Sequence, residues 1–164
     1  MTLLNDSSIV RLGAMDWRFS AWRDAFYPAD MPEEWQLTYF NTQYHCTFLE
    51  RAVWQQASAA EMMQWHADTH ERFRFLLEAD SIRTLPPELA DKALLIHRSD
   101  ARIVWFSRDT SLKDLAAKLT PDAVLPAAVA PGMAASVQYL ISQDGDLQQL
   151  ERVATLLEVM GLAT

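Results

Sequence analysis

The chain has 164 residues, a length typical of one globular domain, and its 50% hydrophobic and 22% charged residues exclude an intrinsically disordered chain. Fourteen Lys and Arg against 22 Asp and Glu give a formal net charge of −8, which opposes binding to nucleic acid or to anionic lipid. No apolar run reaches the roughly 18 residues of a membrane-spanning helix, and the first residues lack the features of a signal peptide. A lone cysteine, Cys46, cannot form an internal disulfide. We therefore expect a single α/β domain over 1–164, in the cytoplasm, with 1–8 as a flexible N-terminus.

Strand and helix signals alternate in the first half. The short apolar run 9–14 predicts a strand, and an aromatic loop follows over 16–28. Asp30 and Pro32 predict the start of a helix that runs to about Phe40, and 41–49 predicts a second strand. Ser58 and Glu61 have the spacing of a capping box, which predicts another helix. Residues 73–79 predict a third strand.

The second half continues the alternation. Four further strands are predicted over 92–97, 102–107, 124–129 and 136–141. Helices are predicted after Ser111 and over 147–160, where apolar residues recur every three to four positions. This alternation is typical of βαβ units around a mainly parallel sheet. The predicted fold class is α/β, with six or seven strands in an open sheet or one that curls toward a barrel.

Several motifs in the first half carry a family resemblance. The segments RLGAMDW (11–17), WRDAFYP (22–28), EW (34–35), TF (47–48) and FRFLLEA (73–79) occur in the order and spacing of the YecE-like family, also known as domain of unknown function 72. The resemblance covers about 9–80, whereas 81–164 is only weakly placed. It implies a TIM-barrel-like (β/α) fold with its site at the carboxyl ends of the strands. Since a full eight-stranded barrel takes about 200 residues or more, the chain is expected to form a reduced or partly open barrel.

The chain departs from the family at the polar positions that would form a site. The family carries Glu and Asn just before its Thr-Phe, and the corresponding residues here are Gln43 and His45. The lysine of its third strand corresponds to Glu78. The resemblance therefore implies an architecture but no activity, and it does not imply an anion-binding site.

Gln43, His45 and Glu78 are the candidate catalytic residues. Alternation along a strand places 43 and 45 on one face, and the neighbouring strand would bring Glu78 beside them. A histidine beside a carboxylate can act as a general base. The alternative is that these three residues form a hydrogen-bonded polar plug inside the barrel.

The candidate ligand-binding residues are those of the aromatic loop: Asp16, Trp17, Trp22, Arg23 and Tyr27. Aromatic faces beside charged groups suit a ligand with a ring, such as a sugar or a nucleobase. The alternative is that the aromatic residues fill the mouth of the barrel.

No metal site or cofactor is predicted. His66 and His70 lie one helical turn apart but lack the glutamate of the zinc-protease pattern, and the four glycines are not clustered into a phosphate-binding loop. We expect a ligand-binding or protein-interaction module that forms a homodimer. One alternative is a small hydrolase or lyase for a sugar-like or nucleoside-like substrate, with His45 as general base. Another is an adaptor protein whose functional surface lies on its helices.

Overall fold

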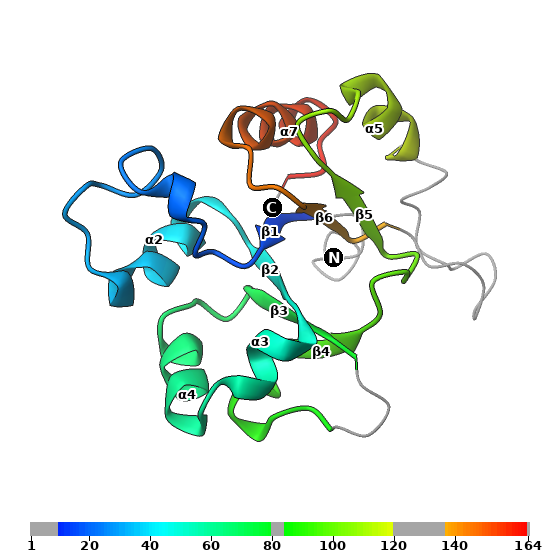
Figure 1. Cartoon of the computed structure of the whole chain (residues 1–164). Coiled ribbons are helices and arrows are strands. Elements are labelled where there is room, and N and C mark those ends of the chain that lie inside the picture. The colour runs from blue at the N-terminus through cyan, green and yellow to red at the C-terminus, as the bar shows by residue number, and fades with distance from the viewer. Residues whose placement is uncertain (1–9, 80–83, 120–136, 164) are drawn as a thin grey trace. The chain divides into compact units, whose positions relative to one another are not determined.

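A computed structural model describes residues 10–79, 84–119 and 137–163 (Figure 1). The chain divides into two compact units, one formed by Gly13–Arg98 and the other by Met1–Leu12 together with Ser99–Thr164. The described residues contain six strands. The predicted flexible segment 1–8 and the predicted strand 124–129 lie outside the described residues.

The unit Gly13–Arg98 is built from parallel strands joined by helices (Figure 1). Its strands pair in the order β4-β3-β2-β1, and every pair is parallel. Parallel neighbours require a crossover connection, and helices supply it here. The strands are β1 (Arg11–Met15), β2 (Cys46–Leu49), β3 (Arg74–Glu78) and β4 (Ala93–Ile96); the helices are α2 (Gln36–Gln43), α3 (Arg51–Gln56) and α4 (Ala59–Ala67), with short 3-10 turns η1 (Ser20–Trp22), η2 (Glu33–Trp35) and η3 (Pro87–Leu89).

The core of this unit lies along β2 and β3. All four residues of β2 are buried, and so are Phe75, Leu76 and Leu77 of β3. Consecutive buried residues mean that both faces of these strands are covered, as in parallel sheets with helices on each side. Because β1 to β4 are parallel, their carboxyl ends lie at one edge of the sheet. The buried residues of β2 and β3 hold this edge in place.

Gly13 allows β1 to approach β2 closely. A Cβ atom at this position would lie 1.9 Å from the carbonyl oxygen of Cys46, which is far inside van der Waals contact. Only glycine fits this point of the β1–β2 pair, where Gly13 is in register with Cys46. The glycine in the middle of β1 is therefore a packing requirement.

The second unit contains β5 (Ile103–Phe106) and β6 (Tyr139–Ser142), which pair in parallel, together with α5 (Leu112–Lys118) and α7 (Leu147–Val159). The start of β1 belongs to this unit, and the Arg11 N–H donates to the Gln138 carbonyl at 2.9 Å. Helix α7 buries Leu150, Val153 and Leu157, which is the stripe that its sequence predicts.

The predicted α/β class is confirmed: the described residues form a reduced, open TIM-barrel-like (β/α) fold. The predicted strand over 41–49 is wrong in its first part, because α2 extends to Gln43 and β2 begins only at Cys46. Helical spacing buries Leu37, Phe40 and Asn41 on one side of α2, and this packing carries the helix past the predicted end. Across the described ranges, no helix is long and apolar enough to cross a membrane.

Candidate functional site

The turn after β1 holds an arginine in place. Asp16 adopts a left-handed backbone conformation, with φ of 68°, which aspartate tolerates better than most residues. Its Oδ1 accepts hydrogen bonds from the backbone N–H groups of Trp17 (2.6 Å) and Arg18 (3.0 Å). The same carboxylate accepts from Arg18 Nε and Nη2, both at 2.8 Å. This paired contact fixes the plane of the guanidinium group.

Two tryptophan rings support the Arg18 guanidinium. Its central carbon lies 4.5 Å from the centroid of the Trp17 ring and 5.7 Å from that of Trp65. The two tryptophans meet edge to face at 5.2 Å, and both are buried. Arg18 itself stays exposed to solvent. The end of β1 therefore presents one ordered cation on an aromatic base.

Two cavities have Arg18 in their lining, and we call them the Arg18 cavities. One has a volume of about 250 Å³ and the other about 390 Å³. Arg18, Glu61 and Trp65 line both. The smaller cavity adds Trp17, Gln64 and Asp68 among others. Carboxylate, amide and guanidinium groups thus converge on a small volume beside a strand end, where α/β barrels keep their sites.

A second polar cluster lies at the ends of β2, β3 and β4. Arg98 Nη2 contacts Glu50 Oε2 at 2.7 Å, and Arg98 Nε contacts Glu78 Oε2 at 3.2 Å. Glu78 Oε1 also accepts from the Arg51 N–H at 2.9 Å. This backbone bond, followed by the Arg98 contact, lowers the pKa of Glu78 below its ordinary value. Glu78 is therefore an ionised, hydrogen-bonded carboxylate at neutral pH.

The structure does not bring the three candidate catalytic residues together. Gln43 is the last residue of α2 and is exposed. His45 lies just before β2, whereas Glu78 ends β3. The register pairs Cys46 with Arg74, so His45 and Glu78 are about five positions apart along the strands, roughly 16 Å. The predicted arrangement on one face is wrong, because residues 41–43 are helical and His45 lies at the amino end of the sheet.

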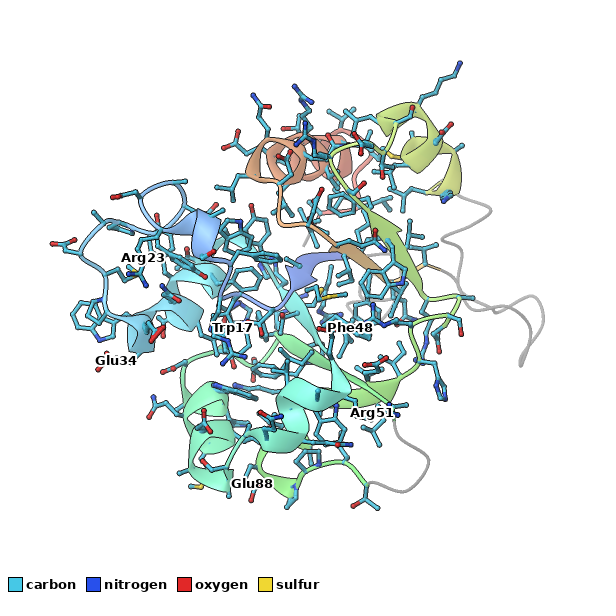
Figure 2. The ribbon with its side chains drawn as sticks, in the orientation of Figure 1. Trp17, Arg23, Glu34, Phe48, Arg51 and Glu88 are labelled. Atoms are coloured by element: carbon cyan, nitrogen blue, oxygen red, sulfur yellow. The ribbon has the colours of Figure 1, made fainter. Side chains whose placement is uncertain are left out.

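The five candidate ligand-binding residues separate into three groups. Asp16 and Trp17 hold Arg18 beside the Arg18 cavities. Trp22 and Tyr27 are only 1% and 2% exposed. Arg23 is exposed on the loop (Figure 2). Sequence patterning alone cannot separate these groups, because all five belong to one aromatic loop.

Packing accounts for the positions of Trp22 and Tyr27. Trp22 stacks on Phe40, with 5.8 Å between ring centroids. The Tyr27 hydroxyl donates to the Trp17 carbonyl at 2.6 Å. Burial raises the pKa of Tyr27 well above its ordinary value, so the hydroxyl remains a donor. These two rings fill the protein interior and support the loop that carries Arg18.

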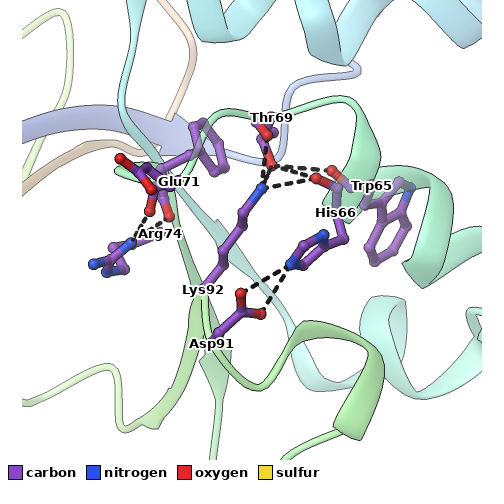
Figure 3. Close-up of polar contacts among 8 residues, drawn as sticks. Trp65, His66, Thr69, Glu71, Arg74, Asp91 and Lys92 are labelled. Carbon is purple, nitrogen blue, oxygen red and sulfur yellow. Dashed lines mark hydrogen bonds and ion pairs between the residues drawn. The ribbon is translucent and has the colours of Figure 1, made fainter.

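His66, in the last turn of α4, and His70, three residues after the helix, contact different partners. His66 Nε2 lies 2.9 Å from Asp91 Oδ1 (Figure 3), and His70 Nε2 lies 3.1 Å from the Asn41 side-chain nitrogen. Within the described ranges, no group of three or more His, Cys, Asp or Glu could hold a metal ion.

A buried lysine holds the end of α4, the helix that carries Glu61 and Trp65. Lys92 is 5% exposed, and its Nζ donates to the carbonyls of His66 (2.8 Å) and Thr69 (2.6 Å) and to the Thr69 hydroxyl (3.2 Å) (Figure 3). A cation at the carboxyl end of a helix is favoured by the helix dipole. Burial lowers the pKa of Lys92.

Parallel β/α units with charged residues at the carboxyl ends of their strands define the class: a reduced TIM-barrel-like α/β protein. The model of the family described as "Protein of unknown function DUF72" matches residues 11–153, most of the chain. The chain belongs to this family. The match extends well beyond residues 9–80, the part to which the sequence motifs pointed. No curated protein and no solved structure matches significantly.

Sequence reasoning missed two features: the contact between Asp16 and Arg18, and the cluster of Arg98 with Glu50 and Glu78, which we call the Arg98 cluster. The positive φ of Asp16 has no sequence signature beyond the residue type. The Arg98 cluster did have a signal: Glu50, Glu78 and Arg98 each lie at or just after the end of a strand. In a parallel sheet such residues share one edge.

Proposed function

We propose that this chain is a binding module whose ligand occupies the Arg18 cavities. The observation that carries this proposal is the Arg18 guanidinium, fixed by Asp16 and supported by Trp17, in the wall that the two cavities share. A preorganised donor group of this kind binds a ligand without first losing side-chain freedom. The larger cavity, at about 390 Å³, has the volume of a small-molecule site.

The charges around Arg18 indicate what kind of molecule binds. Asp16 neutralises the guanidinium, and Glu33, Glu34, Glu61 and Asp68 line the smaller cavity. An anionic ligand would meet a net negative wall. A neutral ligand with several hydroxyl groups and a ring, such as a sugar or a nucleoside, can donate to the carboxylates and accept from Arg18.

The alternative function, a hydrolase or lyase with His45 as general base, has less support. His45 lies at the amino end of β2, away from both Glu78 and the strand-end edge. Glu78 is ionised and already bonded to Arg98 and the Arg51 N–H, which makes it a poor general acid at neutral pH. Binding requires neither residue to transfer a proton.

A thermal-shift screen of the full chain against monosaccharides and nucleosides tests the proposal. A ligand at 100 times its Kd adds about 2.7 kcal/mol of stability, or roughly 5–10 °C for a chain of this size. We expect Arg18→Met to abolish the shift. The matched change Arg23→Met, on the same loop, should leave it intact, and so should His45→Ala. A flat screen, or a shift that survives Arg18→Met, would contradict the proposal.

A further inference from the structure

A groove between α2 and α4 contains an exposed tryptophan. Its volume is about 710 Å³, and we call it the Trp35 groove. Trp35 is 60% exposed. It ends the η2 turn, and its backbone N–H donates to the Pro32 carbonyl at 3.0 Å, so its backbone belongs to a hydrogen-bonded turn. The residues that matter for its chemistry are Met31, Glu34, Trp35, Tyr39, Gln64 and Asp68.

The charge of the Trp35 groove is negative. Among the described residues that line it, Glu34 and Asp68 are carboxylates and none is Lys or Arg. The smaller Arg18 cavity shares Glu34, Gln64 and Asp68. It adds the carboxylates Glu33 and Glu61 and one cation, Arg18, which is paired with Asp16. Asp68 caps the carboxyl end of α4 and accepts from Gln64 Nε2 at 2.8 Å. Lys92 already donates to the carbonyls of His66 and Thr69 at this helix end, so the negative charge of the groove comes from its two carboxylates.

Aromatic rings beside carboxylates form a receptor for an organic cation. The face of a tryptophan attracts a guanidinium or ammonium group, and a nearby carboxylate adds a charge-assisted hydrogen bond. The groove volume is that of a ligand of several residues, larger than one ammonium ion. Met31 offers an adaptable apolar surface for the neighbouring side chain.

We propose that the Trp35 groove binds a basic peptide segment of another protein, with an arginine or lysine side chain lying against Trp35 and facing Glu34 and Asp68. This proposal goes beyond ligand binding in the Arg18 cavities, because it depends on Trp35 and not on Arg18. It locates a protein-interaction surface on helices, while the small-molecule site stays at the strand ends. The two sites share Glu34, Gln64 and Asp68, but Trp35 lines only the groove and Arg18 only the cavities, so Trp35→Ala and Arg18→Met distinguish failure of one proposal from failure of the other.

Fluorescence anisotropy with a defined probe tests the proposal. The probe is a short fluorescein-labelled peptide of alternating arginine and leucine, and its control peptide carries glutamate in place of arginine. We expect the full chain to bind the arginine peptide and not the glutamate peptide. Trp35→Ala should weaken binding about tenfold, which lies between the values for an exposed and a fully desolvated cation–π contact. This variant keeps the net charge, so its effect is separate from general attraction to an acidic protein.

Three further variants complete the test. Met63→Ala removes another side chain that is 61% exposed, on α4, and should leave binding unchanged. Asp68→Asn should weaken binding and reduce its dependence on salt. Trp35→Phe should retain most of the affinity, and circular dichroism checks that each variant is folded.

Several outcomes would overturn the proposal. They are equal binding by wild type and Trp35→Ala, binding of the glutamate peptide, or no binding at millimolar protein. A dimer that Trp35→Ala converts to a monomer would also overturn it, because a second copy of the chain would then occupy the groove.

Discussion

Lys92→Met should destabilise the protein through the end of α4. Methionine has a similar length and preserves the packing of the alkyl chain, but it cannot donate a hydrogen bond. The Thr69 carbonyl would lose a 2.6 Å contact, and the His66 carbonyl would lose one of 2.8 Å. The Thr69 hydroxyl also lies 3.3 Å from the His66 carbonyl, so only the Thr69 carbonyl is fully affected.

The magnitude follows from these contacts. A buried carbonyl without a partner costs about 1–3 kcal/mol, and hydrogen bonds to a charged group contribute about 1.5–3 kcal/mol. Removing a charge that is 5% exposed offsets part of this loss. We expect a net loss of about 2–3 kcal/mol, which lowers Tm by roughly 4–12 °C.

Urea unfolding at pH 7, followed by circular dichroism, measures the change. Lys113→Met is the matched control, because Lys113 is exposed on α5 and should change stability by less than about 0.5 kcal/mol. If Lys92→Met costs no more than the control, or stabilises the protein, the buried lysine does not hold the end of α4.

Other predictions address the sheet, the strand-end cluster and the oligomeric state. Gly13→Ala should cost about 3 kcal/mol or more, measured by the same urea unfolding, because its Cβ would lie 1.9 Å from the Cys46 carbonyl oxygen. Glu78→Gln should cost about 1 kcal/mol at pH 7, a modest value because Glu78 is partly exposed. Since the folded pKa of Glu78 lies below its ordinary 4.5, the advantage of the wild type should disappear as pH falls from 4.5 through that lower pKa; a constant difference down to pH 2 would refute the assignment. We also propose a homodimer, because β4 is an edge strand of the sheet that the described residues form, and an edge strand can pair with a second chain. Light scattering should then give twice 18.7 kDa, and a monomeric mass at micromolar concentration would exclude it.

The sequence predicted the elements whose signals are local. The capping box is an example: Glu61 N–H donates to Ser58 Oγ at 3.1 Å, and Ser58 N–H donates to Glu61 Oε1 at 3.1 Å. Both contacts form between residues three positions apart, so spacing alone reveals them. The stripe of α7 and the alternation of strands and helices are local in the same sense.

The parts that failed depend on contacts between distant residues. The sequence pattern predicts a strand at Asn41, but the Asn41 side chain donates to the Tyr44 carbonyl at 3.1 Å and accepts from the His70 N–H at 2.8 Å. The second of these contacts spans 29 positions. These bonds favour a helix end at Gln43 and move His45 to the amino end of the sheet. No local pattern contains that information.

The candidate site was predicted in part for the same reason. The pattern of aromatic and charged residues directly after a strand predicts Asp16 and Trp17 as site residues, and this pattern is local. Arg18 gains its role from Trp65, 47 positions later, and Arg98 gains its role from Glu50 and Glu78. Identifying these contacts required the strand register.

The most direct test of the central claim follows the tryptophan side-chain signals by NMR while a sugar or nucleoside from the screen is titrated into the full chain. Trp17 and Trp65 line the Arg18 cavities, whereas Trp105 belongs to β5 in the other unit. We predict that the indole signals of Trp17 and Trp65 shift together and saturate at one Kd, while that of Trp105 stays in place. If no ligand moves the first two signals, or if only Trp105 responds, the Arg18 cavities are not the binding site.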